Sequence, residues 1–391
     1  MASKGLQIKS CIFFPIQKRT TNRKTNNRPI NMVKKLDLYT LNEIKISKFL
    51  KTQITDFHKH CNTFSSFELL GVSSLNDKYL ERSERMQPNT GFALFRYSPT
   101  NTLNFFDQLY NCNDTRMYIY HLINGFKGYL SCIHFFQSYK ILNVGLSPQN
   151  MLYNPETLIH IVHDLTSCLI LEQLSKEEKV LHLSYFQSTH YFLPIEFHVI
   201  SYIIEKKETS ISAFNIDAII ASYIDSHPHI KKFSKTFAES YRKECELSLY
   251  PFINKPEEYI VDTILKSTSK TWDTFALSSI LINIIFGLKT VCKKSTGWLD
   301  RVLKLLLLNT YPQVEKRKTV GETIHLFDAI CNNDAAIDDL KNMIICLNAD
   351  SLKKVNQHLL ECNAFVIEAC ESRKKYSLMF ATLANRGSCA L

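Results

Sequence analysis

The chain of 391 residues is 45% hydrophobic and 12% aromatic, which suffices for a core of two lobes or domains and excludes a disordered protein. Its net charge of +10 is concentrated in residues 1–35, which hold nine Lys and Arg and no acidic residue, so the rest carries about +1. A nearly neutral body argues against nucleic acid as a partner. The basic segment 17–29 is compatible with polyanion binding or a nuclear localisation signal, and we expect a solvated loop.

Cysteine usage and hydropathy indicate an intracellular protein without membrane attachment. The twelve cysteines include no Cys-x-x-Cys pair and follow no secretory leader, as expected for reduced thiols. The longest apolar run, residues 275–288, is shorter than a membrane span and contains Ser and Asn, so it predicts a buried core helix. The His and Cys residues of 58–61 and 227–229 have no second cluster that would complete a zinc site.

The N-terminal quarter combines short strands with one helix. Runs rich in β-branched and aromatic residues predict strands at residues 11–16, 30–36, 66–72 and 91–97. Between the second and third of these, apolar residues recur at helical spacing over residues 41–54. The pattern predicts a small β-rich lobe.

After residue 103 the chain is predicted to be mainly helical. Residues 116–136 place apolar side chains from Ile119 to Ile133 on one stripe, and similar patterns continue to the C-terminus. Residues 141–171 interrupt them with two short strands and polar turns, in which Asn150 precedes the first strand and Asp164 follows the second. We interpret this segment as a two-stranded clip with polar groups at both ends.

The clip and the segments after it resemble the protein kinase superfamily. NVGLSPQNMLY at 143–153 resembles the catalytic loop H-R-D-L-K-P-x-N-I-L, and IVHDLT at 161–166 resembles the D-F-G segment. Later landmarks follow in order: YFLPIEF with Glu196, WDTFALSSIL with Asp273 and EKRKTVGETI with Arg317. The resemblance implies an α+β, bilobal kinase-like fold with a small, degenerate β-rich N-lobe and a large helical C-lobe. It also implies structural roles for Asp273 and for a buried Glu196–Arg317 ion pair.

Finer features are similar to the divergent serine/threonine kinases of large DNA viruses. These features are the segments LNEIKIS and KSCIFFP, the residues TWD at the start of a predicted helix, and an insertion between Glu196 and Asp273. The resemblance covers about residues 5–330. It predicts a degenerate N-lobe at 1–97, a C-lobe at 98–330 with an insertion at about 200–270, and a helical extension at 331–391. It implies a place in the host cytoplasm, viral factory or virion, with the nucleus as an alternative.

The resemblance assigns roles within the clip. In kinases an Asp of the catalytic loop accepts the proton of the attacking hydroxyl, and a Lys nearby contacts the γ-phosphate. These positions are Gly145 and Ser147 here, so we expect no catalytic residue. Asn150 and Asp164 occupy the positions that hold Mg²⁺. Without that context they would be ordinary turn or cap residues.

The predicted N-lobe also departs from the residue pattern of active kinases. Lys35 aligns with the lysine that contacts the phosphates, with Lys34 one position away, and Glu43 aligns with its ion-pair partner. Outside this context the two lysines would be a solvated pair. Gln7 and Ser10 stand where the glycine loop should approach the triphosphate, so the binding of the implied cofactors, ATP and Mg²⁺, is left open.

The sequence leaves three functions open. The first is a pseudokinase that binds a protein partner without efficient phosphoryl transfer. The second is a weakly active or unconventional serine/threonine kinase that acts on a protein substrate with another base, since phosphoryl transfer depends strongly on positioning and electrostatics. The third is a nucleic-acid-associated protein that uses the basic N-terminal region.

Overall fold

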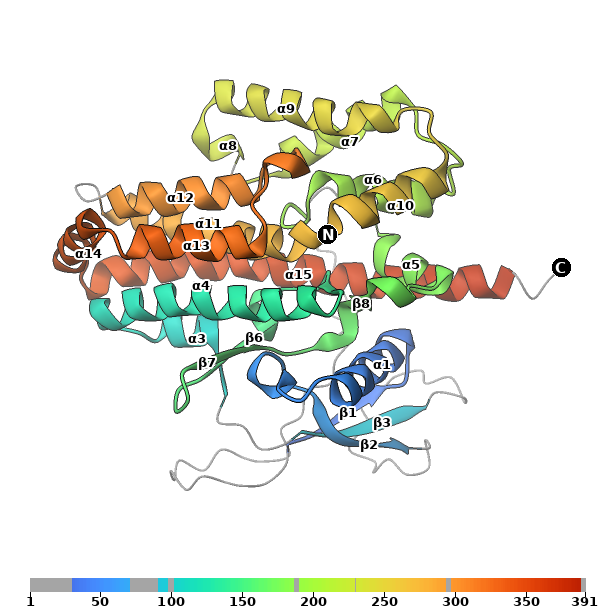
Figure 1. The fold of residues 1–391 in the computed structure, drawn as a ribbon, viewed down its shortest axis with the longest axis horizontal. Helices are drawn as coiled ribbons and strands as arrows, with labels where there is room; N and C mark the ends of the chain where they lie inside the picture. The colour runs from blue at the N-terminus through green and yellow to red at the C-terminus, as the bar shows by residue number, and fades with distance from the viewer. Residues whose placement is uncertain are drawn as a thin grey trace, which may run out of the picture.

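The computed structural model describes residues 30–70, 91–97, 102–185, 190–228, 230–292 and 297–387. The predicted strand at 11–16, the basic segment 17–29, Gln7 and Ser10 lie outside these residues. Within them the fold is mixed α+β, with a small β-containing part and a much larger helical part (Figure 1). The pattern of strands and helices in the sequence predicts this division.

Three antiparallel strands form the small sheet, in the order β1-β3-β2. They are β1 (Ile30–Lys35), β2 (Phe64–Leu70) and β3 (Phe92–Tyr97). The aromatic residues Phe64, Phe95 and Tyr97 of the sheet, together with Ala93, pack with Ile44 of the following helix, which closes a small hydrophobic core. The predicted strands at 30–36 and 91–97 are thereby confirmed, and the one at 66–72 is confirmed up to Leu70, since residues 71 and 72 lie outside the described residues.

Helix α1 (Leu38–Gln53) lies between β1 and β2 in the sequence. Asp37 begins it by accepting the Thr40 N–H at 2.8 Å, a side-chain cap that satisfies one of the free amides of the first turn. Ile46 and Leu50 point from α1 into the core of the helical part. This helix therefore connects the two parts of the fold, and it confirms the helix predicted at 41–54.

Two long helices form the centre of the larger part. Helix α4 (Thr115–Ser138) buries the apolar stripe that the sequence predicts, and α11 (Trp272–Val291) is buried on nearly all sides. Among the described residues, 269–291 form one helix long and apolar enough to cross a membrane, but 78% of its most apolar window is buried in the protein. Burial all round is typical of a core helix, as predicted for 275–288.

The predicted clip lies between these helices and the small sheet. Strand β6 (Met151–Asn154) pairs with β7 (Ile159–Val162) as an antiparallel hairpin, and β5 (Ile141–Asn143) pairs with β8 (Cys168–Ile170). The short strand β4 (Leu103–Asn104) extends the hairpin. The turn η3 (Pro148–Asn150) precedes β6, and the turn η4 (Leu165–Ser167) follows β7.

The remaining helices surround this centre (Figure 1). They are α3 (Phe105–Tyr110), α5 (Lys176–Leu183), α6 (Ile195–Lys206), α7 (Ala213–Ser226), α8 (Ile230–Phe233), α9 (Lys235–Leu249), α10 (Glu257–Ser267), α12 (Gly297–Asn309), α13 (Val320–Cys331), α14 (Asp334–Cys346) and α15 (Ala349–Gly387). The predicted insertion at about 200–270 thus contains α7 to α10, and the predicted extension contains α14 and α15.

Helix α15 lies against the clip. It runs beside α11 and reaches α5 and the η3 turn (Figure 1). Asn356 of α15 donates to the backbone carbonyls of Leu109 and Tyr110, and Asn363 donates to the Tyr110 hydroxyl at 2.7 Å. The C-terminal helix is therefore fastened to the same part of the fold that carries the candidate site.

Candidate functional site

Asp164 is at the centre of the candidate site, directly after β7. Its backbone adopts the left-handed conformation with φ of 64°, which is uncommon for a residue with a side chain. The carboxylate accepts a hydrogen bond from the Thr166 hydroxyl at 2.6 Å and from the Thr166 N–H at 3.3 Å. These bonds fix the carboxylate in the turn and direct it toward helix α15.

Lys374 of α15 forms an ion pair with this carboxylate. Its Nζ lies 2.7 Å from Asp164 Oδ2 and 2.8 Å from Thr166 Oγ1. Burial alone would raise the pKa of Asp164, but Lys374, Lys34 and the Thr166 hydroxyl hold that pKa well below its ordinary value. Asp164 is therefore ionised and already neutralised by a cation of the same chain. Sequence analysis did not identify Lys374, which lies beyond the region of resemblance.

Asn150 is buried within the η3 turn. Its Nδ2 donates to the Gly145 carbonyl at 3.0 Å, and its Oδ1 accepts the Ser147 N–H at 2.9 Å. The His163 N–H donates to the Asn150 carbonyl, which places the two predicted metal-holding positions next to each other. The amide nevertheless performs the turn-stabilising role that Asn commonly has.

The arrangement does not fit a Mg²⁺ site. Mg²⁺ requires oxygen ligands in near-octahedral geometry, whereas the Asp164 carboxylate is paired with an ammonium and the Asn150 oxygen accepts a backbone N–H. Elsewhere in the ranges that the structure describes, no group of three or more His, Cys, Asp or Glu side chains could hold a metal ion of another kind. The predicted ligands are thus brought together, but in a form that is already satisfied without a metal.

Gly145, where the resemblance would place a catalytic Asp, has no room for a side chain. A Cβ atom placed there would lie 2.6 Å from Ser167 Cβ and 2.8 Å from Ser167 Oγ. Ser167 is fully buried, and its carbonyl accepts the Val144 N–H, so neither its side chain nor its backbone can move aside without cost. Any side chain at position 145 would therefore force the η4 turn to shift.

Lys34, rather than Lys35, pairs with Glu43 of α1. The Lys34 Nζ lies 2.6 Å from Glu43 Oε2, and the Tyr97 hydroxyl donates to Glu43 Oε1 at 2.9 Å. Successive side chains of a strand point to opposite faces, so only Lys34 of β1 faces the helix while Lys35 is exposed. The assignment of the pair to Lys35 is corrected by one residue.

The Lys34 ammonium belongs to the same charge cluster as Asp164. Burial acts to lower the pKa of Lys34, but Glu43, Tyr97 and Asp164 raise it above its ordinary value, so the ammonium is always charged. Burial and the charge of Lys34 lower the pKa of His163, whose imidazole packs edge-on against Tyr97. The structure therefore pairs Lys34 with Glu43 and places both within electrostatic range of Asp164.

Helix α1 is bonded to the segment that follows Asp164. Asn42 donates its amide to the carbonyls of Thr166 and Cys168 at 3.0 and 2.7 Å. The Tyr39 hydroxyl donates to the Leu181 carbonyl, and Lys45 pairs with Glu178 of α5 at 2.5 Å. The α5 helix is thereby held between α1 and α15. Cys168 is buried, and burial raises its pKa well above the ordinary value, as expected for an inert thiol.

Two of the predicted structural residues, Glu196 and Arg317, meet in the protein interior. Both guanidinium nitrogens of Arg317 bond the Glu196 carboxylate, at 2.6 and 2.9 Å, and the Trp272 Nε1–H donates to the same carboxylate at 3.0 Å. All three side chains are buried, so the expected ion pair is present. Asp273 is buried too and accepts the Asn143 N–H at 3.1 Å, which anchors the start of the clip to α11.

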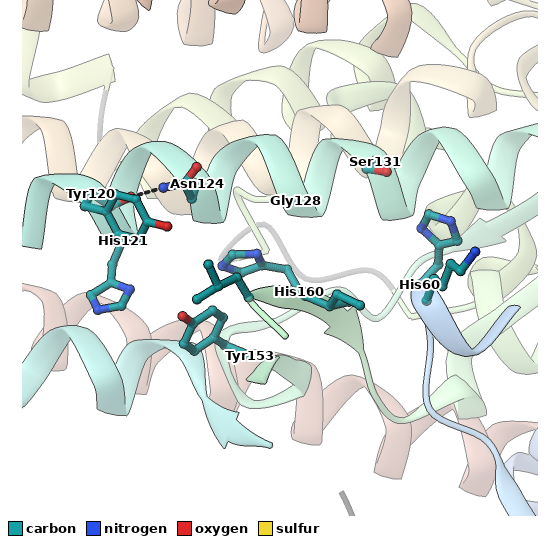
Figure 2. A pocket seen from close by; sticks show the side chains of 11 residues that line it. His60, Tyr120, His121, Asn124, Gly128, Ser131, Tyr153 and His160 are labelled. Carbon is teal, nitrogen blue, oxygen red and sulfur yellow. Dashed lines mark hydrogen bonds between the residues drawn. The ribbon is translucent and has the colours of Figure 1, made fainter. Parts of the chain in front are cut away.

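A separate hollow of about 400 Å³ lies between α4 and the β6–β7 hairpin (Figure 2). His60, His121, Tyr153 and His160 contribute to its wall, and Gly128 allows the His160 imidazole to lie against α4. Burial and His121 lower the pKa of His160 to about 4, so this imidazole is neutral at pH 7. None of the residues predicted for the site lines this hollow.

Comparisons with known proteins do not assign the chain to a family. No protein-family model matches the sequence, and no curated protein matches it significantly. The functional assignment therefore depends on the residues and their geometry.

Proposed function

We propose that the protein is a kinase-like pseudokinase that acts by binding other proteins rather than by transferring phosphate. The observation that carries this proposal is the ion pair between Lys374 and Asp164. In a working kinase the aligned Asp must hold Mg²⁺ against the nucleotide phosphates. Here an ammonium of the C-terminal helix satisfies that carboxylate, so binding of Mg²⁺ requires the pair to break.

The absence of a base supports the same conclusion. Gly145 cannot accept a proton, and Ser167 fills the space that a longer side chain would occupy. A general base contributes typically about 10²- to 10⁴-fold to a rate. Loss of this group together with a neutralised metal-holding carboxylate favours a role other than catalysis.

Three other contacts support kinase-like ancestry. Lys34 and Glu43 form the strand-to-helix ion pair that kinases use to position the phosphates. Asp273 anchors the catalytic-loop backbone, and Arg317 joins Glu196 across 121 positions of the sequence. These contacts lie in the order that the resemblance predicts, and the bilobal kinase-like fold is part of the proposal.

We propose that a protein partner binds the outer surface of the inserted helices. The inserted helices expose large apolar side chains, including Phe214 on α7, Leu247 on α9 and Tyr259 on α10. The viral resemblance makes an active kinase or a virion component the expected kind of partner.

The proposal is tested by the thermal stability of the full chain with ATP, in the presence and absence of Mg²⁺. A ligand at about 100 times its Kd stabilises the folded state by about 2.7 kcal/mol, which is readily measured. We expect no Mg²⁺-dependent shift for the wild type. Lys374→Met releases Asp164 and should gain such a shift, whereas Lys375→Met, at the exposed neighbouring position, should not.

The outcomes separate the parts of the proposal. Asp164→Asn in the Lys374→Met background should remove the gained shift. A shift absent from every variant would retain the pseudokinase assignment but reject Lys374 as its cause. A Mg²⁺-dependent shift in the wild type that Asp164→Asn abolishes would contradict the assignment itself.

The second candidate is a weakly active serine/threonine kinase that uses another base. The intact Lys34–Glu43 pair favours it, since this pair must be in place for kinase catalysis. Catalysis would require α15 to leave Asp164. Phosphate transfer by the wild type, lost in Lys34→Met and unchanged in Lys35→Met, would favour this candidate.

A further inference from the structure

The hollow between α4 and the β6–β7 hairpin has the size of a small-molecule site (Figure 2). Its volume of about 400 Å³ lies in the range in which such sites are found, roughly 300–1,000 Å³. Four lining residues recur every three or four positions of α4 and therefore share one face of the helix: His121, Asn124, Gly128 and Ser131. Tyr153 and His160 line the hollow from the hairpin. Gly128 is needed for this approach, because a Cβ atom there would lie 2.5 Å from His160 Nδ1.

Three buried side chains present polar atoms to the hollow. The Tyr153 ring lies 4.9 Å from the His160 ring and 5.5 Å from the His121 ring, centre to centre, so the three form one aromatic wall (Figure 2). Within the described ranges, the His121 ring nitrogens, His160 Nδ1 and the Tyr153 hydroxyl have no hydrogen-bond partner, and each of these atoms remains accessible. Polar atoms of buried residues are normally hydrogen-bonded, so these are available to a ligand.

The aromatic wall is uncharged at pH 7. Burial lowers the pKa of His121 below its ordinary value, and burial with His121 lowers the pKa of His160 to about 4. Burial raises the pKa of the Tyr153 hydroxyl. Lys59 is the one charged residue among the described residues that line the hollow, and it is exposed and paired with Asp56 at 3.1 Å. The wall therefore offers neutral donors and acceptors, which would not compensate for the lost hydration of an ion.

Leu158, in the turn of the hairpin, adds an apolar edge to the hollow. Its backbone adopts the left-handed conformation with φ of 57°, which is uncommon for a residue with a side chain. Its side chain lines the hollow and is 52% exposed. Strained residues of this kind cluster at functional sites, and an exposed apolar side chain beside a hollow is stabilised when a ligand covers it.

We propose that this hollow binds an uncharged planar heteroaromatic compound with both hydrogen-bond donors and acceptors, the chemistry of a nucleobase. The ring of the ligand would pack against the aromatic wall and Leu158, as bases stack on aromatic side chains. Its polar edge would bond the histidines and Tyr153, because a neutral imidazole and a phenol each supply a donor and an acceptor. The proposal does not depend on the assignment as a pseudokinase, since neither Asp164 nor Lys374 lines the hollow.

The test is a titration of the full chain with adenine at pH 7.5, followed by saturation-transfer difference NMR without nucleotide or metal. We expect saturable binding to the wild type. Tyr153→Phe keeps the ring and removes the hydroxyl, so the affinity should fall by about 3- to 10-fold, as for the loss of one hydrogen bond. Tyr139→Phe, at an exposed position outside the lining, is the matched control and should leave the affinity unchanged.

A blocking variant locates the binding. Ser131→Trp introduces a large side chain into the hollow from an exposed position of α4 and should abolish saturable binding. Ser138→Trp, at an exposed position of the same helix outside the lining, should bind adenine as the wild type does.

Two further probes test the chemistry of the ligand. Indole is planar and uncharged but has a donor only, and benzoate is planar and ionised. Adenine should bind about 10-fold more tightly than either, because only adenine matches both donors and acceptors without a charge. Four results would each overturn the proposal: no saturable binding of adenine to the wild type, equal binding to Ser131→Trp and Ser138→Trp, an unchanged affinity in Tyr153→Phe, or binding of indole or benzoate as tight as that of adenine.

Discussion

A methyl group added at Gly145 tests how closely the surrounding structure packs against this position. Gly145→Ala would place a Cβ atom 2.6 Å from Ser167 Cβ, whereas carbon atoms in contact keep about 3.5 Å or more. One of the two must therefore move by nearly 1 Å in a closely packed interior. Overpacking of this kind costs about 1–3 kcal/mol of the free energy of unfolding.

Ser167→Gly removes the obstructing atom and makes the prediction specific. Alone it should cost about 0.5–1 kcal/mol, because glycine is more flexible in the unfolded chain. In the double variant the added methyl group has space, so the cost of Gly145→Ala should largely disappear. The two substitutions should thus show a favourable coupling of about 1–2 kcal/mol, within the range found for residues in direct contact.

The assay is urea unfolding of the wild type, the two single variants and the double variant at pH 7.5. Gly321→Ala is the matched control, because no atom lies within 4 Å of the Cβ that it adds to helix α13. This control should be neutral or slightly stabilising, since alanine favours a helix over glycine. A Gly145→Ala variant as stable as the Gly321→Ala control, or one that Ser167→Gly fails to rescue, would refute the packing argument.

Two further predictions concern buried charge and acid sensitivity. Arg317→Ala should lower the free energy of unfolding by about 3–5 kcal/mol, because Glu196 is left buried without its partner. The control is Lys316→Ala, which breaks an exposed ion pair with Glu244. An equal effect of the two substitutions in urea unfolding would contradict the reasoning. Burial, together with His121, lowers the pKa of His160 to about 4. As the pH falls from about 6.5 toward 4, the unfolded chain therefore binds a proton at this histidine that the folded chain does not. The free energy of unfolding should fall by about 1.4 kcal/mol per pH unit in this range. His160→Leu should therefore lose less stability than the wild type between pH 7 and pH 5, and a loss as large as that of exposed His134→Leu would show that His160 does not contribute.

The sequence predicts the local elements well because their patterns are local. The apolar and β-branched residues of 30–36 and the helical spacing of 41–54 depend on neighbours a few residues away, and both elements are present. The choice between Lys34 and Lys35 was harder, since two adjacent lysines fit either face of a strand. Only the observed pairing of β1 with β3 decides which of them faces Glu43.

The part of the site that could not be predicted comes from distant segments. The contact between Lys374 and Asp164 joins residues 210 positions apart and depends on the direction of α15 across the clip. No local pattern marks Lys374 among the basic residues of the C-terminal helix. Similarly, the closure of Ser167 over Gly145 is a matter of packing, which composition and spacing do not reveal.

The central claim is tested most directly by transfer of the γ-phosphate from Mg²⁺-ATP to a generic protein substrate. The measurement compares the wild type with Asp164→Ala at equal concentration. If Lys374 occupies Asp164 and no base stands at Gly145, the two proteins should give the same background rate. Transfer by the wild type that Asp164→Ala abolishes would contradict the pseudokinase assignment and establish an active kinase.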